Sequence, residues 1–354
     1  MRARSHQEVL GVQHPIVLAP MAGGPSTPEL AAAVSNAGGL GSLGVAYLAP
    51  PAIRDAIAAV RRLSHRAFAV NLFVPEPAAP DTERIPEIQA LLAPYRAELG
   101  LPAPRLPDPL VIPFEDQLAV VLETRVPICS FTFGVPAAEV VRALRDAGTL
   151  VVGTATHVEE ARALERAGVD AIVAQGAEAG GHRGTFLGRA EDALIGTMAL
   201  VPQVVDAVRV PVLAAGGIMD GRGVVAALAL GACAAQLGTA FLACDEAGTD
   251  AHYRRALAES QDTSSTITRA FSGRAARGLR NRFVEEWEAR EPAPFPVQNV
   301  LTGDIRAAAR RAGRPELVNL WAGQGSPRIR RVPAAELMRA LLEEMAAARR
   351  DAGA

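Results

Sequence analysis

Residues 149–175, TLVVGTATHVEEARALERAGVDAIVAQ, set out a strand, a helix and a second strand in direct succession. The two ends, 149–153 and 170–175, are mainly apolar runs without alternation, which is typical of parallel strands buried on both faces. Thr156 with Glu159 three positions later matches a capping box, which predicts that a helix begins there. The stretch therefore predicts one β-α-β unit of a parallel sheet.

The same alternation of apolar run and alanine-rich helix extends along most of the chain. Eight such units in about 240 residues match a (β/α)8 barrel, with a doubly wound open sheet as the structural alternative. The expected strands are 15–19, 40–44, 67–71, 127–131, 149–153, 170–175, 210–215 and 234–239. The expected helices are 28–37, 50–63, 136–147, 156–167, 196–208 and 220–230.

Two parts of the chain fall outside this alternation. Residues 75–113 contain too many prolines for regular structure throughout, so we interpret them as an insertion over one face of the barrel. The barrel is expected to occupy residues 1–245, including this insertion, and residues 246–354 are expected to form a helical capping region or lid. Helices are expected in that region at 252–259, 282–288 and 333–350.

Composition excludes several classes of function. The formal net charge of −2 gives no basic footprint for a nucleic-acid partner. All 36 basic residues are arginine, so Schiff-base catalysis, pyridoxal phosphate linkage and a Walker A phosphate loop, which need lysine, are excluded. No cluster of residues has metal-ligand spacing, so no metal site is expected. Three cysteines in so long a chain favour the reducing cytoplasm.

One uncharged stretch, Gly223 to Cys244, is long enough to span a membrane. Because it is rich in alanine and contains Gly231, Gln236 and Gly238, we expect a buried helix, a tight turn and a buried strand there, and no membrane association.

The active site of such a barrel lies at the carboxyl ends of the strands. Gly216 and Gly217 follow the seventh expected strand, and Gly238 and Thr239 close the eighth. Glycine lets backbone amides approach a ligand closely, and these two loops are where such barrels bind phosphate. With lysine absent, amides, a hydroxyl or arginine would hold the phosphate. The alternative is that these glycines only make tight turns.

Two neutral amides and one histidine are the other candidates. Asn71 and Gln175 end the third and sixth strands, and an amide that donates and accepts suits a flavin ring, although it could equally bond a neighbouring loop. His182 lies in the glycine-rich loop after the sixth strand, and either acts as a general base or bonds a carbonyl. Glu178 and Arg183 flank His182 and could orient its ring or pair with each other.

Several motifs together resemble those of the nitronate monooxygenases, also called 2-nitropropane dioxygenases. They occur in the family's order between residue 15 and about residue 325, and the proline-rich insertion is covered least. The motifs are APMAGGPSTPELAAAVSNAGGLGSLG (19–44), NLFVP (71–75), FTFG (131–134), QGAEAGGHRGTF (175–186), AAGGI (214–218), QLGT (236–239) and LWAGQ (320–324).

The resemblance implies noncovalently bound FMN and oxidation of alkyl nitronates or nitroalkanes by O2 to a carbonyl compound and nitrite, through electron transfer to the flavin. His182 would be the catalytic base, and no nicotinamide would be consumed. The expected partners are the small substrate and O2, and the assembly to consider is a homodimer. The residues expected to contact FMN are Met21, Asn71, Gln175, Gly180, Gly217, Gln236, Leu237, Gly238 and Thr239.

The substrate side departs from the family pattern. Family members often place tyrosines and a lysine there, whereas residues 295–303, FPVQNVLTG, contain neither. The roles of Phe295, Asn299 and Gly303 and the natural substrate therefore stay open. The alternative function is an FMN-dependent NAD(P)H:quinone or enoyl-thioester reductase on the same barrel. A barrel that binds a phosphate ligand without flavin is a more distant alternative.

Overall fold

The computed structural model describes residues 5–76 and 82–353, so residues 1–4, the 77–81 part of the predicted insertion and residue 354 lie outside it. Eight parallel strands pair in the order β1-β9-β8-β6-β5-β4-β3-β2. A bridge between Val17 and Leu40 joins the two ends of this order, so the sheet closes on itself. The (β/α)8 barrel is thus confirmed, and the open sheet is wrong. The strands are β1 (Ile16–Leu18), β2 (Gly41–Gly44), β3 (Phe68–Phe73), β4 (Ile128–Thr132), β5 (Leu150–Ala155), β6 (Ala171–Gln175), β8 (Val212–Ala215) and β9 (Ala234–Leu237).

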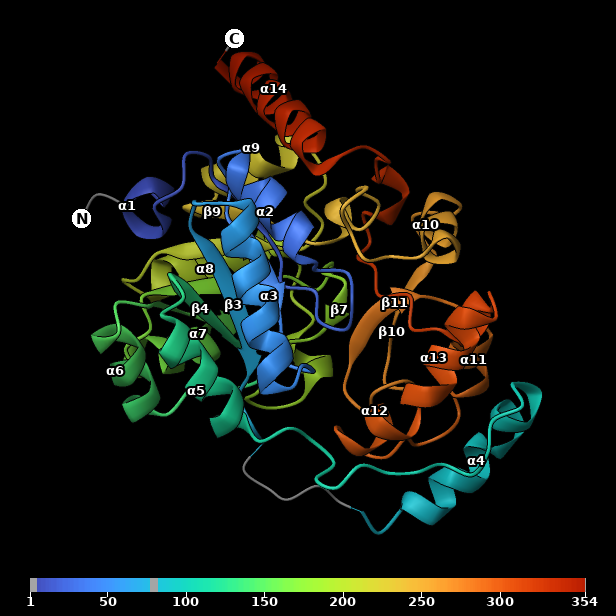
Figure 1. The fold of residues 1–354 in the computed structure, drawn as a ribbon. Helices are drawn as coiled ribbons and strands as arrows, with labels where there is room; N and C mark the ends of the chain where they lie inside the picture. Colours follow the sequence, from blue (N-terminus) through green and yellow to red (C-terminus); the bar gives the residue numbers. More distant parts are fainter. Residues whose placement is uncertain (1–4, 77–81, 354) are drawn as a thin grey trace.

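Helices surround this barrel and bury its outer face (Figure 1). A separate apolar cluster is made of residues from the barrel strands, and Val9 and Leu10 of α1 (His6–Leu10) belong to it. The uncharged stretch 223–244 forms most of a helix, a turn and a strand, as predicted, and none of the described helices is long and apolar enough to cross a membrane. The surrounding helices are α2 (Pro28–Asn36), α3 (Pro50–Leu63), α5 (Phe114–Thr124), α6 (Ala138–Asp146), α7 (Val158–Arg166), α8 (Thr197–Ala207) and α9 (Gly221–Ala229).

The start of α7 corrects the predicted capping box. The N-cap residue is His157, whose side chain makes no capping bond. Thr156 donates through its backbone N and its hydroxyl to Oε2 of Glu160, at 2.6 and 2.7 Å, and not to Glu159. Glu159 is exposed and pairs with Arg162. The pattern thus located the helix start, but the carboxylate that organises it is one residue further on.

The proline-rich insertion contains a helix, α4 (Ile85–Glu98), despite Pro94 inside it. Its buried residues belong to a second apolar core, which they share with the C-terminal part of the chain. Tyr95 Oη donates to Glu286 at 2.6 Å, and Arg96 pairs with Asp304 at 2.8 Å. The insertion is therefore fastened to the C-terminal region (Figure 1).

The C-terminal region combines helices with a small sheet that sequence patterns did not predict. The expected helices at 252–259, 282–288 and 333–350 are present as α10, α11 and α14, and α14 packs on α9 and α2 of the barrel. The sheet has the order β10-β11-β7, and β7 (Gly181–His182) comes from the loop after β6. The elements of this region are α10 (Ala251–Ala258), β10 (Ser265–Thr268), β11 (Ala276–Leu279), α11 (Arg282–Glu286), α12 (Val297–Leu301), α13 (Gly303–Arg311) and α14 (Ala334–Gly353), with short 3-10 turns at η3 (Pro315–Leu317) and η4 (Ser326–Arg328). Two further 3-10 turns, η1 (Ala190–Ala193) and η2 (Thr239–Phe241), lie in barrel loops.

Candidate active site

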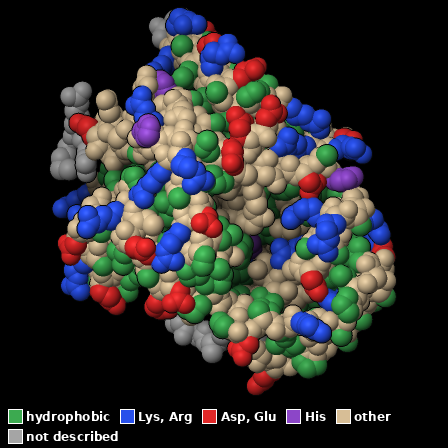
Figure 2. Space-filling view, in the orientation of Figure 1, with side chains coloured by type: hydrophobic (Ala, Val, Ile, Leu, Met, Phe, Trp, Pro, Cys, Tyr) green, Lys and Arg blue, Asp and Glu red, His purple; other side chains and the backbone are tan. Residues whose placement is uncertain are grey.

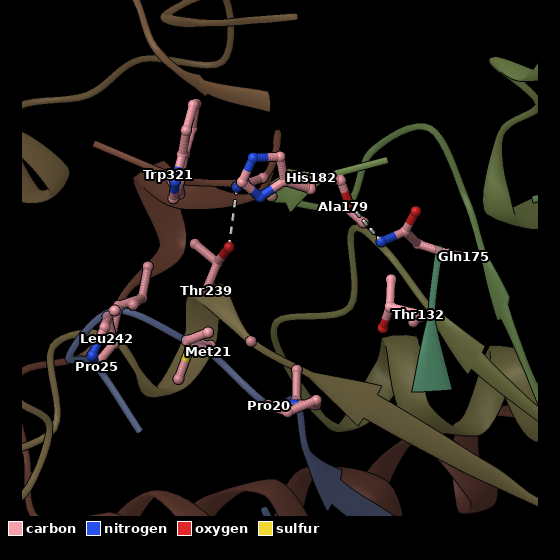
Figure 3. Close-up of a pocket in the computed structure, with 18 of the residues that line it drawn as sticks. Pro20, Met21, Pro25, Thr132, Gln175, Ala179, His182, Thr239, Leu242 and Trp321 are labelled. Atoms are coloured by element: carbon pink, nitrogen blue, oxygen red, sulfur yellow. Dashed lines mark hydrogen bonds between the residues drawn. The ribbon is translucent and has the colours of Figure 1, made fainter. Parts of the chain in front are cut away.

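A cavity of about 450 Å³ lies between the carboxyl ends of the barrel strands and the C-terminal region. Figure 2 shows the molecular surface hollowed between these two parts of the chain, and Figure 3 shows Gln175, His182, Thr239 and Trp321 around the cavity. Its volume lies in the range of ordinary cofactor and ligand sites. The predicted residues that line it are Met21, Asn71, Gln175, Gly180, His182, Gly217, Gln236, Gly238 and Thr239. Leu237 is not among them, since it is buried in the core between barrel and helices.

The loops after β8 and β9 offer unpaired backbone donors at one end of the cavity. Gly216 and Gly217 have φ values of 120° and 71°, a conformation that favours glycine. Within residues 5–76 and 82–353, no protein acceptor meets the backbone N–H of Gly217 or Gly238. Such amides bind phosphate oxygens without needing a cation. The residues present therefore fit a bound phosphate group.

Carboxylates already occupy the nearby helix N-termini. Glu178 accepts from the backbone N and the hydroxyl of Thr197 at the start of α8, at 2.8–2.9 Å. Asp220 accepts from Gly223 N at the start of α9, at 3.0 Å. An anionic ligand is thereby directed away from these two helices and toward the loop amides.

Of the two predicted amides, Gln175 is engaged by the protein itself. Its Nε2 donates to the carbonyl of His182 at 3.0 Å, and its Oε1 accepts from Gly184 N at 2.8 Å. These bonds hold both sides of His182 in place, so Gln175 shows the loop bonding that we considered as the alternative. Asn71 Nδ2 donates to the hydroxyls of Ser130 and Thr132, at 3.0 and 3.2 Å.

His182 stands on β7, opposite Ala276 of β11. Its Nε2 lies 2.8 Å from Oγ of Ser272. Aromatic rings surround the imidazole, with centroid distances of 5.7 Å to Phe133 and 5.4 Å to Trp321. The histidine is therefore fixed in orientation and faces the cavity from the side of the C-terminal region.

The charged neighbours of His182 in sequence play neither predicted role. Arg183 is fully buried and donates to the carbonyls of Gly176, Gln175 and Ala193 at 2.7–3.2 Å. Glu178 is bound to Thr197 as described above, so the two do not pair. Neither side chain bonds the imidazole within the described structure, since both are engaged by these other partners.

The partly buried position of His182 favours the neutral form of its ring. Loss of water lowers the pKa of the imidazole to about 3, and the positive charges of Arg274 and Arg306 act in the same direction. At neutral pH the ring therefore has one nitrogen free to accept a proton. The same two cations favour a negative charge in the cavity next to the ring.

Sequence reasoning missed the cation on the substrate side. Arg306 of α13 lines the cavity beside Asn299 and Gly303 and donates to the carbonyl and Oδ1 of Asn299, at 2.6 and 2.9 Å. Burial lowers the pKa of Arg306 to about 10, so it stays charged at neutral pH. Residues 299, 303 and 306 recur at helical spacing, and this pattern could have predicted that Arg306 lies on the same helical face as Asn299 and Gly303. Tyr47, Phe133 and Trp321 were also not anticipated as lining residues.

Arg274→Met should shift the acid limb of the profile of kcat/KM against pH to higher pH. Arg274 lies 4.0 Å from the Phe133 ring centroid, and its charge disfavours the imidazolium form of His182. Its removal should raise the pKa of His182 from about 3 toward its ordinary value, so a reaction that needs neutral imidazole is lost at higher pH than in wild type. The profile of kcat/KM against pH and NMR titration of the ring measure this. Arg280→Met on the exposed surface is the control, and an unchanged limb in Arg274→Met would contradict the assignment.

Fold and site define a class of (β/α)8 barrel enzymes that combine unpaired loop amides with a histidine in one cavity. The chain belongs to the nitronate monooxygenase family, whose family model matches residues 5–344. It is therefore a flavin-dependent oxidoreductase.

Individual relatives agree with this family. A "Probable nitronate monooxygenase" of Staphylococcus aureus (strain Newman) is 45% identical over 325 residues, which cover 91% of each chain. The structure of nitroalkane oxidase from Streptomyces ansochromogenes is similar with a TM-score of 0.91 and 46% identity, covering 96% of this chain and 98% of that one. FabK from Thermotoga maritima is similar with a TM-score of 0.77 and 32% identity, covering 99% and 98%.

Proposed function

We propose that this protein is an FMN-dependent enzyme that oxidises alkyl nitronates and nitroalkanes with O2 to a carbonyl compound and nitrite. The observation that carries the proposal is a neutral, oriented His182 in the same cavity as the loop amides of Gly217 and Gly238. The Streptomyces relative named nitroalkane oxidase supports the choice of substrate class.

The cofactor would be held mainly by the barrel. The amides of Gly217 and Gly238 would bind the phosphate, while Asn71 and Met21 would lie along the ring system. Bound there, the flavin supplies an acceptor for substrate electrons that O2 can reoxidise. Because no lysine exists in the chain, we expect binding to rest on amides and hydroxyls.

The C-terminal region would hold and deprotonate the substrate. His182 accepts the α-proton of a neutral nitroalkane at a ring nitrogen. The positive charges of Arg306 and Arg274 stabilise the nitronate anion that results, which offsets the low proton affinity of the partly buried imidazole. The rings of Phe133, Phe295 and Trp321 place apolar surface beside His182, where the proton would be transferred.

An anaerobic spectrum of the purified protein tests this function. We expect a yellow protein that releases FMN on denaturation, identified by its mass, and whose flavin absorbance falls when propyl-2-nitronate is added without nicotinamide. Oxygen uptake and nitrite release should follow on admitting air. A protein that takes up no flavin would overturn the proposal. Bleaching by NADH, with no response to the nitronate, would instead support the reductase alternative.

A further inference from the structure

Ser272 forms a contact with the imidazole that the reaction scheme above does not use. It lies in the connection between β10 and β11, it has no exposed surface, and its Oγ is 2.8 Å from Nε2 of His182. The same oxygen is 3.1 Å from the carbonyl oxygen of Arg274 and 3.3 Å from the backbone N of Arg274. One hydroxyl thus has three neighbours at hydrogen-bond distance.

The hydroxyl proton can be assigned among these neighbours. The carbonyl of Arg274 only accepts, and Ser272 is the one donor found for it in the described structure, so the O–H is directed there. The lone pairs of Oγ then accept from the N–H of Arg274 and from Nε2 of His182. Nε2 must therefore carry hydrogen. A neutral imidazole has one such hydrogen, which leaves the lone pair on Nδ1.

The turn that carries Ser272 is held rigidly. Gly273 has a φ of 80°, and a Cβ at this position would lie 2.1 Å from the carbonyl oxygen of Ala293. The adjoining Phe295 in turn has its ring centroid 6.2 Å from that of His182. Ser272 is thus fixed relative to the imidazole by backbone contacts as well as by its own hydrogen bonds.

We propose that Ser272 is a positioning residue that holds neutral His182 in the Nε2–H tautomer, so that Nδ1 is the atom that takes the α-proton of the substrate. This inference rests on the proposed function. The bond that breaks is the substrate C–H, its electron pair stays on the nitronate, and the proton moves to Nδ1. Among the described residues no carboxylate bonds this ring, and Arg274 and Arg306 are the charges that act on it. A neutral serine orients the base without placing a second negative charge near the nitronate.

The test compares Ser272→Ala and Ser272→Thr in FMN-loaded protein, with Ser64→Ala as a control that removes another buried hydroxyl far from the cavity. In Ser272→Ala we expect kcat/KM for neutral nitroethane to fall about 10- to 100-fold, with oxidation of pre-formed ethyl nitronate changed by about twofold or less. Ser272→Thr should restore most of the loss, because it keeps the hydroxyl.

Nitrogen NMR of the His182 ring gives a readout that a purely structural role would not move. Wild type should show a protonated Nε2 and an unprotonated Nδ1, and Ser272→Ala should show a mixture of the two tautomers. A wild-type ring protonated at Nδ1, or full nitroethane activity in Ser272→Ala, would overturn the inference. If wild type oxidises neither substrate, the proposed function fails, while the tautomer measurement still decides the role of Ser272.

Discussion

His182→Asn is expected to lower kcat/KM for a neutral nitroalkane by on the order of 10²- to 10⁴-fold, the usual contribution of a general base. Asparagine retains a side-chain amide that can donate to Ser272 but cannot accept the α-proton. Oxidation of the pre-formed nitronate needs no such acceptor, so it should fall by less than about tenfold. Oxygen uptake with each form of the same substrate measures the difference.

Two comparisons make this prediction specific. His65→Asn changes an exposed histidine outside the cavity and should leave both substrates unaffected. Flavin content of His182→Asn should match wild type, because the backbone amides of Gly217 and Gly238 lie on barrel loops. An equal loss with nitroalkane and nitronate would show that His182 acts in binding or folding, and not as a base.

Glu160→Ala is expected to lower the free energy of unfolding by about 3–5 kcal/mol. The Glu160 side chain is fully buried and accepts from Thr156 on one side, and from the backbone N of Phe186 and Leu187 on the other. Alanine would leave these donors without a partner and out of reach of water. Chemical denaturation followed by circular dichroism measures the loss.

The neighbouring Glu159 gives a matched control, because it is exposed and bonds only to Arg162 in the described structure. Glu159→Ala should change stability by about 0.5 kcal/mol or less. Glu160→Gln should fall between the two variants, since its amide keeps one acceptor oxygen. Similar stability of Glu159→Ala and Glu160→Ala would contradict the role given to the buried carboxylate.

Most of the barrel was predictable because its signals are local. Each strand is an apolar run, and the pairs Gly216–Gly217 and Gly238–Thr239 each stand at a strand end. His182 was also found from its place in a glycine-rich loop. These features depend only on residues that are close together in the sequence, so sequence patterns can predict them.

The rest of the site depends on contacts between distant segments. Ser272 is 90 residues away from His182 in sequence, and β7 has only two residues, too few for any periodicity. The charge of Arg274 acts on the imidazole, and the pairing of β11 with β7 brings these two distant segments together. Local sequence also could not choose between Glu159 and Glu160, because both carboxylates fit a helix start. Hydrogen bonds from the distant backbone N atoms of Phe186 and Leu187 select Glu160.

The pairing of β7 with β11 separates two tasks between two scaffolds. The loops that would retain the cofactor belong to the barrel, whereas His182, the proposed base, lies in the small sheet that β7 forms with β10 and β11. Substitutions in that sheet can therefore alter proton transfer while cofactor retention stays intact. A chain with this arrangement can acquire new substrates through substitutions in the C-terminal region, while the barrel loops stay unchanged.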